Sequence, residues 1–202
     1  MSMPTPHSPA AERNRLPILR VLRRQIEPGW RVLEIGAGTG QHACYFAEQL
    51  ADVTWQATDT AENVPILTAG LFDSPGGALL PPIVLDVLRD DWPAGPWDAV
   101  YSANTAHIMH WRAVCAMLEG AAAALRSGGV LVLYGPFSRD GAHTSESNRR
   151  FDDQLRGRDP AMGIRDLSAV ESAAVRNGFC RIAEYAMPAN NLLLVWRLKR
   201  VA

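Results

Sequence analysis

Three glycines at every second position, directly after a short apolar run, are the feature that most constrains how this chain folds. Residues 32–40 read Val-Leu-Glu-Ile-Gly-Ala-Gly-Thr-Gly. The apolar positions Val32, Leu33 and Ile35 predict a buried parallel strand, and a helical pattern starts near Gln41. Glycines in the turn between them let the backbone approach a ligand closely and leave several N–H groups free to face it. The sequence therefore predicts a strand–turn–helix unit with a ligand at the turn.

The spacing of these glycines separates two classes of nucleotide-binding turn. A dinucleotide fingerprint needs Gly at 36, 38 and 41, but position 41 is Gln and the third glycine is Gly40. An acidic residue, Glu34, lies two places before Gly36. This Glu-x-Gly-x-Gly-x-Gly spacing resembles the first motif of the class I S-adenosylmethionine (SAM) methyltransferases. The resemblance implies SAM as the cofactor, S-adenosylhomocysteine as the product, and cofactor contacts from Glu34, Gly36, Gly38 and Gly40.

Acidic residues also stand at the ends of the next two predicted strands. Asp59 closes residues 53–58, a β-branched and aromatic-rich run that predicts the second strand. A carboxylate in this place can accept both ribose hydroxyls of an adenosine, and the alternative is a helix N-cap. The third strand is expected at 83–85 and is followed by Asp86 and Val87. The methyltransferase resemblance implies that Asp86 accepts the adenine amino group and that Val87 covers the ring.

Strand and helix patterns alternate along the rest of the chain. They predict a doubly wound, mostly parallel sheet of seven strands, a Rossmann-like α/β fold with an antiparallel strand near the C-terminus. Strands are expected at 32–35, 53–58, 83–85, 97–101, 130–134, 179–187 and 191–199, and helices at 11–26, 41–51, 61–71, 107–126, 146–156 and 167–177.

Three local features refine this prediction. The first ten residues are expected to be loose, and the first helix to become regular near Pro17. Ser127-Gly128-Gly129 is expected to end the helix at 107–126 as a glycine C-cap. The length of 202 residues and the 48% hydrophobic content fit one domain, residues 1–202.

Residues 136–166 interrupt the alternation after the fifth strand. This polar stretch is too long for an ordinary connection, and its predicted helix at 146–156 has Thr144 or Ser145 as N-cap. Loops beyond the carboxyl ends of strands carry ligand contacts in open α/β sheets. We expect the segment to be a lid that selects the substrate. The alternative for its arginines is a solvated, ion-paired helix face.

Short motifs far from the glycine turn are more specific than the glycines. They include Arg13-Asn14, Gln41-His42, Tyr134-Gly135-Pro136-Phe137, Thr144-Ser145-Glu146-Ser147-Asn148, Gly163-Ile164-Arg165-Asp166 and Asn190-Asn191. Together they resemble the DUF938 family of class I methyltransferase-like proteins, over nearly the whole chain. The resemblance implies the SAM-dependent fold and SAM binding at the positions above, and it implies no particular substrate.

Candidates for the chemistry come from the ends of the fourth and fifth strands and from the lid. Methyl transfer depends mainly on holding nucleophile, methyl carbon and sulfur in line with water excluded. Asn104 follows the fourth strand, where class I enzymes place cofactor and acceptor contacts. His107 is expected at the start of the next helix, as a general base or as a capping or packing residue. Tyr134 is expected to orient the acceptor or only to shield the sheet edge. His143 is expected to orient the acceptor or only to be a polar surface group of the lid.

Composition limits the kinds of partner and the cellular location that we expect for this protein. The balance of 20 basic and 21 acidic residues argues against a nucleic-acid surface, and no apolar run reaches the roughly 18 residues that span a bilayer. The N-terminus lacks a secretion signal, and Cys44, Cys115 and Cys180 lack metal-ligand spacing and indicate a reducing compartment. We therefore expect a cytoplasmic protein with a small-molecule substrate, no membrane partner and no metal.

Four functions remain open at this point. The leading one is a SAM-dependent transferase that methylates oxygen, nitrogen or sulfur of a small molecule. The second is an enzyme that transfers an aminopropyl group or a hydride. The sequence has no evident acidic pocket for a polyamine after the fourth strand, which argues against aminopropyl transfer, and its glycine spacing argues against hydride transfer. A non-catalytic SAM-binding protein would not need the polar lid, and a macromolecular methyltransferase fits poorly with the near-neutral charge. Residues 104–107 read Asn-Thr-Ala-His and not Asn-Pro-Pro-Tyr, which argues against methylation of DNA adenine or glutamine.

Overall fold

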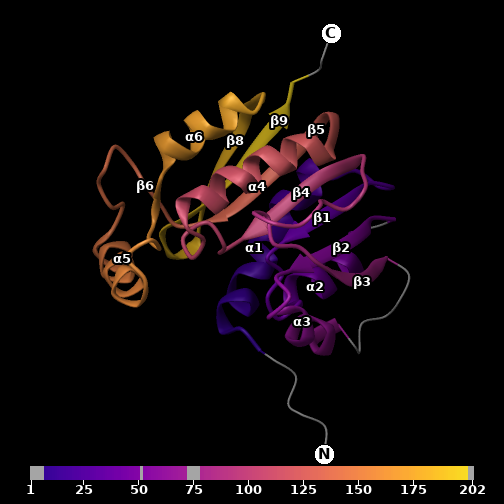
Figure 1. The fold of residues 1–202 in the computed structure, drawn as a ribbon, viewed down its shortest axis with the longest axis horizontal. Coiled ribbons are helices and arrows are strands. Elements are labelled where there is room, and N and C mark those ends of the chain that lie inside the picture. The colour runs from indigo at the N-terminus through magenta and orange to yellow at the C-terminus, as the bar shows by residue number, and fades with distance from the viewer. Residues whose placement is uncertain (1–6, 51, 72–77, 200–202) are drawn as a thin grey trace, which may run out of the picture.

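A seven-stranded sheet forms the centre of the molecule, in the order β3-β2-β1-β4-β5-β9-β8 (Figure 1). The structure, a computed structural model, describes residues 7–50, 52–71 and 78–199. The strands of the sheet are β1 Arg31–Ile35, β2 Thr54–Asp59, β3 Leu79–Val84, β4 Trp97–Ala103, β5 Leu125–Gly135, β8 Phe179–Met187 and β9 Asn191–Leu198. Neighbouring strands are parallel except that β9 is antiparallel to both β5 and β8. The predicted doubly wound sheet with its antiparallel C-terminal strand is confirmed.

The strand order reverses at β1, and this reversal positions the site. The chain runs outward from β1 through β2 to β3, then crosses to the other side of β1 with β4 and β5. Ile35 at the end of β1 pairs with Thr58 of β2 and with Ser102 of β4. The carboxyl ends of three parallel strands therefore meet at one edge, the place where ligands bind in open α/β sheets.

Helices cover both faces of the sheet and create two cores. The helices α1 Pro9–Gln25, α2 Gln41–Gln49 and α3 Val64–Leu71 lie on one face, and α4 Trp111–Ala124 and α6 Leu167–Arg176 lie on the other (Figure 1). Because side chains alternate along a strand, Val32 packs in the first core and its neighbour Leu33 in the second. No helix among the described residues is long and apolar enough to cross a membrane.

The first helix begins earlier than predicted. It starts at Pro9, with Ser8 as its N-cap, and the Ser8 Oγ accepts a hydrogen bond from the Ala11 N–H at 3.3 Å. Pro17 lies inside the helix. The expectation of a loose start is therefore wrong for residues 8–10, because a serine cap followed by proline at the first helical position is a start signal. Residues 1–6 lie outside the described part of the chain.

The boundaries of β3 and α4 also differ from the prediction. Strand β3 begins at Leu79 and contains Pro81 and Pro82, which an edge strand tolerates because its outer N–H groups need no ladder partner. Helix α4 spans Trp111–Ala124 instead of 107–126. The expected glycine C-cap is wrong, because Leu125 already pairs with Trp97 of β4 and residues 127–129 lie inside β5, where the register shifts.

The insertion after β5 folds into a small unit of its own. It contains β6 Phe137–Ser138, α5 Glu146–Arg158 and β7 Arg165–Asp166, and β6 pairs with β7 in parallel. Helix α5 is capped by Ser145, whose side chain accepts from the Asn148 N–H, as predicted. In Figure 1, α5 lies at the left of the molecule, far from α3 and β3. The short helix η1 Pro188–Asn190 joins β8 to β9.

Candidate functional site

The glycine turn after β1 has the backbone that its sequence requires. Gly36, Gly38 and Gly40 have φ angles of 70°, 59° and 77°, in the left-handed region that favours glycine. The turn is less open to a ligand than predicted, because three of its N–H groups already have partners. They donate from Ala37 to Thr58 O, from Gly38 to the Asp59 carboxylate and from Gly40 to Ala37 O. The expectation of several free donors is therefore wrong for these three groups, which tie the turn to β2 and to itself.

Helix α3 packs directly against the backbone of this turn. A Cβ atom added to Gly70 of α3 would lie 2.0 Å from Thr39 O. A Cβ added to Gly40 would lie 2.6 Å from Leu71 Cδ2. Gly40 therefore supports the turn by close packing and starts α2 as its N-cap, and it does not line the cavity described next.

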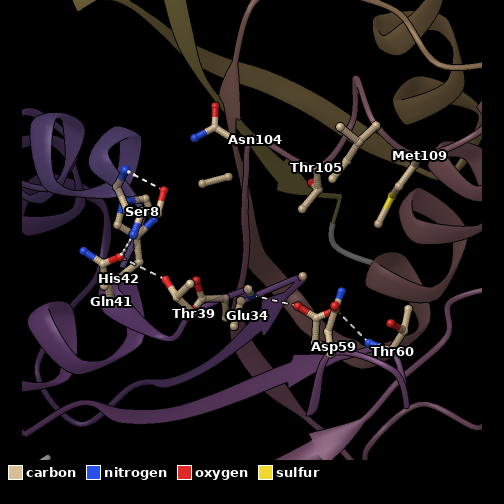
Figure 2. A pocket seen from close by; sticks show the side chains of 17 residues that line it. Ser8, Glu34, Thr39, Gln41, His42, Asp59, Thr60, Asn104, Thr105 and Met109 are labelled. Carbon is tan, nitrogen blue, oxygen red and sulfur yellow. Dashed lines mark hydrogen bonds between the residues drawn. The ribbon is translucent and has the colours of Figure 1, made fainter. Parts of the chain in front are cut away.

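A cavity of about 430 Å³, here called the glycine-turn cavity, opens at the meeting point of the strand ends (Figure 2). Its size is within the roughly 300–1,000 Å³ typical of small-molecule sites. The lining comes from the turn, the ends of β1, β2 and β4, the start of α1 and the loop before α4. It includes Ser8, Ala11, Glu34, Gly36, Gly38, Thr39, Gln41, His42, Asp59, Thr60, Asn104, Thr105, Ile108 and Met109. Five of the eight predicted cofactor residues are thus brought together: Glu34, Gly36, Gly38, Asp59 and Asn104.

Glu34 is a buried residue in the lining of this cavity. It is 2% exposed, and its Oε2 accepts a hydrogen bond from the Trp55 indole N–H at 2.7 Å. Burial raises the pKa of Glu34 to about 8, against the lowering effect of the Trp55 hydrogen bond. The carboxyl group is therefore largely protonated at neutral pH, and a cation placed beside it would favour its ionised form.

Asp59 serves the fold and the cavity together. Its Oδ2 accepts from the Gly38 N–H at 2.7 Å, and its Oδ1 accepts from the Thr60 N–H at 2.8 Å and the Asn63 side chain at 3.0 Å (Figure 2). A carboxylate has about four acceptor positions, so one remains open, on Oδ2. Asp59 is not the N-cap of α3, which begins only at Val64. Its hydrogen bonds hold the turns on either side of it, and room is left for one ribose hydroxyl where two were expected.

A smaller hollow of about 140 Å³ continues from the cavity toward β3. It shares Gly36, Asp59, Thr60 and Met109 with the glycine-turn cavity and adds Ile35, Leu85, Asp86, Val87 and Ala113. Asp86 Oδ1 accepts from the Leu88 N–H at 2.9 Å and so shapes the turn after β3. The remaining predicted cofactor residues, Asp86 and Val87, therefore line a pocket adjoining the first cavity.

The loop after β4 forms another wall of the glycine-turn cavity. Asn104 adopts a left-handed φ of 59°, and its N–H donates to Tyr134 O at 2.8 Å. A Cβ at Gly36 would lie 2.4 Å from Thr105 Cγ2, so glycine permits the loop to approach the turn. Among the described residues, no group of three or more His, Cys, Asp or Glu is placed to hold a metal ion.

His42 and Asn14 were not predicted as site residues. His42 lines the cavity, and its Nε2 lies 2.7 Å from Asn14 Oδ1 while its Nδ1 lies 3.2 Å from the Tyr101 hydroxyl. Burial lowers the pKa of His42 to about 4, so the imidazole is neutral. Both residues are buried polar groups on otherwise apolar helix faces, and that pattern was the available signal.

The three predicted catalytic residues lie outside the lining of the glycine-turn cavity. His107 precedes α4 and does not begin it, so its predicted helical position is wrong. It is 6% exposed and contacts the Phe151 ring edge to face at 5.2 Å, and burial lowers its pKa to about 4. Burial raises the pKa of Tyr134, which ends β5. His143 lines a different cavity, beneath the insertion.

The insertion packs against the loop before α4 and does not cover the cavity. No residue of 136–166 lines the glycine-turn cavity, whereas Ser8 and Ala11 at the start of α1 do. The Ser8 N–H donates to the Gln41 side chain, which also accepts from the Thr39 hydroxyl at 3.0 Å (Figure 2). Closure of the insertion over a bound ligand therefore stays a prediction.

The sequence matches one family model over almost its full length. The model is described as "Protein of unknown function (DUF938)" and matches residues 5–198. The chain belongs to the DUF938 family.

This DUF938 protein has the fold of longer solved structures. An O-methyltransferase family protein from Burkholderia thailandensis has a TM-score of 0.80 at 15% identity, covering 96% of this chain and 58% of that chain. Human N-acetylserotonin methyltransferase in complex with SAM has a TM-score of 0.78 at 15% identity, covering 94% and 53%. The pyocyanin biosynthetic protein PhzM has a TM-score of 0.73 at 16% identity, covering 96% and 60%. The DUF938 chain therefore spans little more than half of these proteins, and the likeness is one of fold.

Proposed function

We propose that this protein is a SAM-dependent methyltransferase that acts on a small-molecule acceptor. The observation that carries the proposal is the junction of the glycine-turn cavity with the smaller hollow, because Asp59 lines both. A larger compartment on a glycine turn, a carboxylate at the junction and a smaller apolar hollow beyond it fit the amino-acid end, ribose and adenine of SAM. The similarity in fold to a methyltransferase solved with SAM supports the same assignment.

Each part of the cofactor has a chemical partner in this arrangement. The open acceptor position on Asp59 suits a ribose hydroxyl, as charge-assisted hydrogen bonds are the strong ones. The hollow between Leu85, Val87 and Met109 suits a flat apolar ring, with Asp86 at its rim for an amino group. The buried Glu34 in the cavity lining suits the positively charged end of the molecule, because ionisation of a buried carboxyl becomes favourable beside a cation.

The protein's contribution to transfer is mainly positional. Bound SAM supplies an electrophilic methyl group on a sulfonium. The chain would hold that group and the acceptor in line between the turn and the Asn104 loop, with water excluded. His107 is a weak base at neutral pH because its pKa is near 4, so we assign it a packing role. Tyr134 is buried outside the lining of the glycine-turn cavity, and its backbone oxygen accepts from the Asn104 N–H, so the role we propose for it is to hold the Asn104 loop against which the acceptor lies.

Calorimetry tests the cofactor assignment. S-adenosylhomocysteine and SAM should bind with micromolar affinity, and NAD should not bind. SAM binding at pH 7 should release a proton from Glu34, seen as a heat that changes with the ionisation enthalpy of the buffer, and Glu34→Gln should abolish that dependence. Micromolar NAD binding with no signal from S-adenosylhomocysteine would contradict the proposal. Catalysis is tested separately, by release of S-adenosylhomocysteine when SAM is incubated with panels of small phenols, amines and thiols.

A further inference from the structure

A second cavity of about 430 Å³ lies beneath the insertion, here called the insertion cavity. It is lined by α5, the β6–β7 pair with the loop after β6, and single residues of α4 and α6, and it shares no lining residue with the glycine-turn cavity. The polar side chains that line it are Ser138, His143, Asp152, Arg156, Arg165 and Asp166. The proposed methyl transfer uses none of them.

The two carboxylates of this cavity are already occupied by donors from the protein. Asp152 is 5% exposed, and its Oδ1 accepts from the Ile164 N–H at 2.6 Å. Its Oδ2 accepts from Arg156 Nε at 2.8 Å and lies 3.5 Å from His143 Nε2. Asp166 accepts hydrogen bonds from Ser138, Gly141 and Ser168, and these bonds lower its pKa to about 2. A ligand therefore finds few acceptor oxygens here that still need a donor.

The polar atoms of the insertion cavity that have no protein partner are nitrogens, chiefly the donor nitrogens of two arginines. Arg156 uses only Nε, so both of its terminal nitrogens have no partner in the described part of the chain. Arg165 donates from Nε and Nη2 to the backbone oxygens of Ala106, Met109 and Ala161, which leaves Nη1 over. Within residues 7–50, 52–71 and 78–199 no carboxylate forms an ion pair with Arg165. His143 Nδ1 is enclosed and has no hydrogen-bond partner there either.

The Arg156 side chain is half-exposed, but its guanidinium is already hydrogen-bonded to Asp152 and lies against the backbone at Gly163. A Cβ at Gly163 would lie 2.6 Å from Arg156 Nη2 and 2.8 Å from Asp152 Oδ1, so only glycine lets the guanidinium lie against this backbone. Gly163 has a φ of 143°, outside the range that side-chain-bearing residues prefer. An arginine held in this way loses little freedom when it pairs with a ligand, which favours binding.

We propose that the insertion cavity is a binding site for a small anion, a molecule that carries a carboxylate or phosphate group. The anion is held by the terminal nitrogens of Arg156 in the paired geometry that guanidinium forms with such groups. Arg165 Nη1 and the unpartnered Nδ1 of His143 lie in the lining of the same site. Arg165 also donates hydrogen bonds to the loop whose Ile108 and Met109 line the glycine-turn cavity. The Arg165 side chain would therefore connect a bound anion to that loop.

Titration of the full-length protein with inorganic phosphate and with succinate tests this site, at constant ionic strength maintained with sodium chloride. The NMR signals of the Trp111 indole and the Arg156 Nε–H should shift in a saturable way with at least one of the two anions. Arg156→Gln should weaken binding by about tenfold or more, and Arg156→Lys should weaken it less, since it keeps the charge and loses the paired geometry. Arg158→Gln, an exposed change on the same helix, is the matched control and should bind as the wild type does.

The proposal is overturned if neither anion gives saturable shifts, or if Arg158→Gln weakens binding as much as Arg156→Gln. The second result would indicate only the general positive charge of α5. Should Arg156→Gln fail to fold, the wild-type titration and Arg156→Lys still decide the question. The experiment uses no SAM, so its failure leaves the proposed methyl transfer untouched, and the reverse also holds.

Discussion

Asp59 is the residue at which fold and proposed function are hardest to separate. It accepts three hydrogen bonds from the chain and has one acceptor position left. Hydrogen bonds to a charged group are worth about 1.5–3 kcal/mol. Asp59→Ala should therefore weaken S-adenosylhomocysteine binding about tenfold or more in calorimetry, and should also lower the melting temperature because the Gly38 N–H loses its partner.

The comparison for this change is Asn63→Ala, which removes one donor to Asp59 and one side chain from the cavity wall but leaves the carboxylate in place. It should lower stability slightly and weaken binding less than Asp59→Ala does, since the open oxygen is Oδ2 and Asn63 binds Oδ1. An unchanged dissociation constant in Asp59→Ala would mean that this residue only holds the turn.

Among single residues, site residues at the ends of strands were predicted well from the sequence. Glu34, Asp59, Asp86 and Asn104 were found because parallel strands bring their carboxyl ends to one edge. His42 was missed as a site residue because it lies on a helix, where a polar side chain is as often turned to solvent. The number of free N–H groups in the glycine turn could not be predicted either, because it depends on contacts with β2.

At the scale of elements, two parts of the chain are candidates to cover the proposed cofactor, namely α1 and the insertion. Ser8 and Ala11 of α1 line the cavity, and no residue of 136–166 does. Hydrogen exchange with S-adenosylhomocysteine should therefore show new protection at residues 8–14 and in the glycine turn. Gln41→Ala, which removes the contact to Ser8, should reduce the protection of 8–14 more than that of the turn. Protection concentrated in α5 would instead support the lid expected from the sequence.

Boundaries were predictable where a local signal acts alone and failed where two signals conflict. The starts of α5 and α2 were placed correctly, because Ser145, one of the two caps expected for α5, and Gly40, the glycine before α2, are local start signals. The end of α4 was misplaced because glycines 128 and 129 are typical of a C-cap, whereas pairing of Leu125 with β4 ends the helix first. Strand pairing depends on residues far away in the sequence, and no local pattern contains it.

At the scale of the whole molecule, buried titratable groups predict how stability depends on pH. Burial lowers the pKa of His42 and of His107 from 6.5 to about 4, so the unfolded chain binds more protons there and stability falls as pH drops through that window. Burial raises the pKa of Glu34 from 4.5 to about 8, so the folded protein binds more protons and stability falls as pH rises through that window.

The two histidines outweigh the single glutamate below pH 6.5, and Glu34 acts alone above it. Thermal unfolding should therefore show maximal stability near pH 6.5, with a decline toward pH 8. Glu34→Gln should remove that alkaline decline and make the decline between pH 6.5 and 4.5 steeper, because Glu34 no longer opposes the two histidines there, provided the amide keeps the Trp55 hydrogen bond. A melting temperature that is constant from pH 6.5 to 8 in the wild type would contradict the raised pKa of Glu34.

The overall topology was the most predictable level. Alternating strand and helix patterns with short connections leave few arrangements other than a doubly wound sheet, and the seven-stranded order agrees. What the sequence did not contain is the division into two cavities. The walls of the glycine-turn cavity include α1 and the loop 104–110, and those of the insertion cavity include α5 and the β6–β7 pair. The positions of these segments depend on packing between distant parts of the chain.

The contact of α3 with the glycine turn has a consequence for anyone who would redesign this protein. A library that preserves positions 36, 38 and 40 and randomises the rest of the wall would treat Gly70 as a free helical position. Any larger residue there meets the carbonyl of Thr39 and displaces the turn, so the library would lose ligand binding through a residue that never touches the ligand. Position 70 belongs to the motif in every practical sense, although no pattern search confined to the turn would include it.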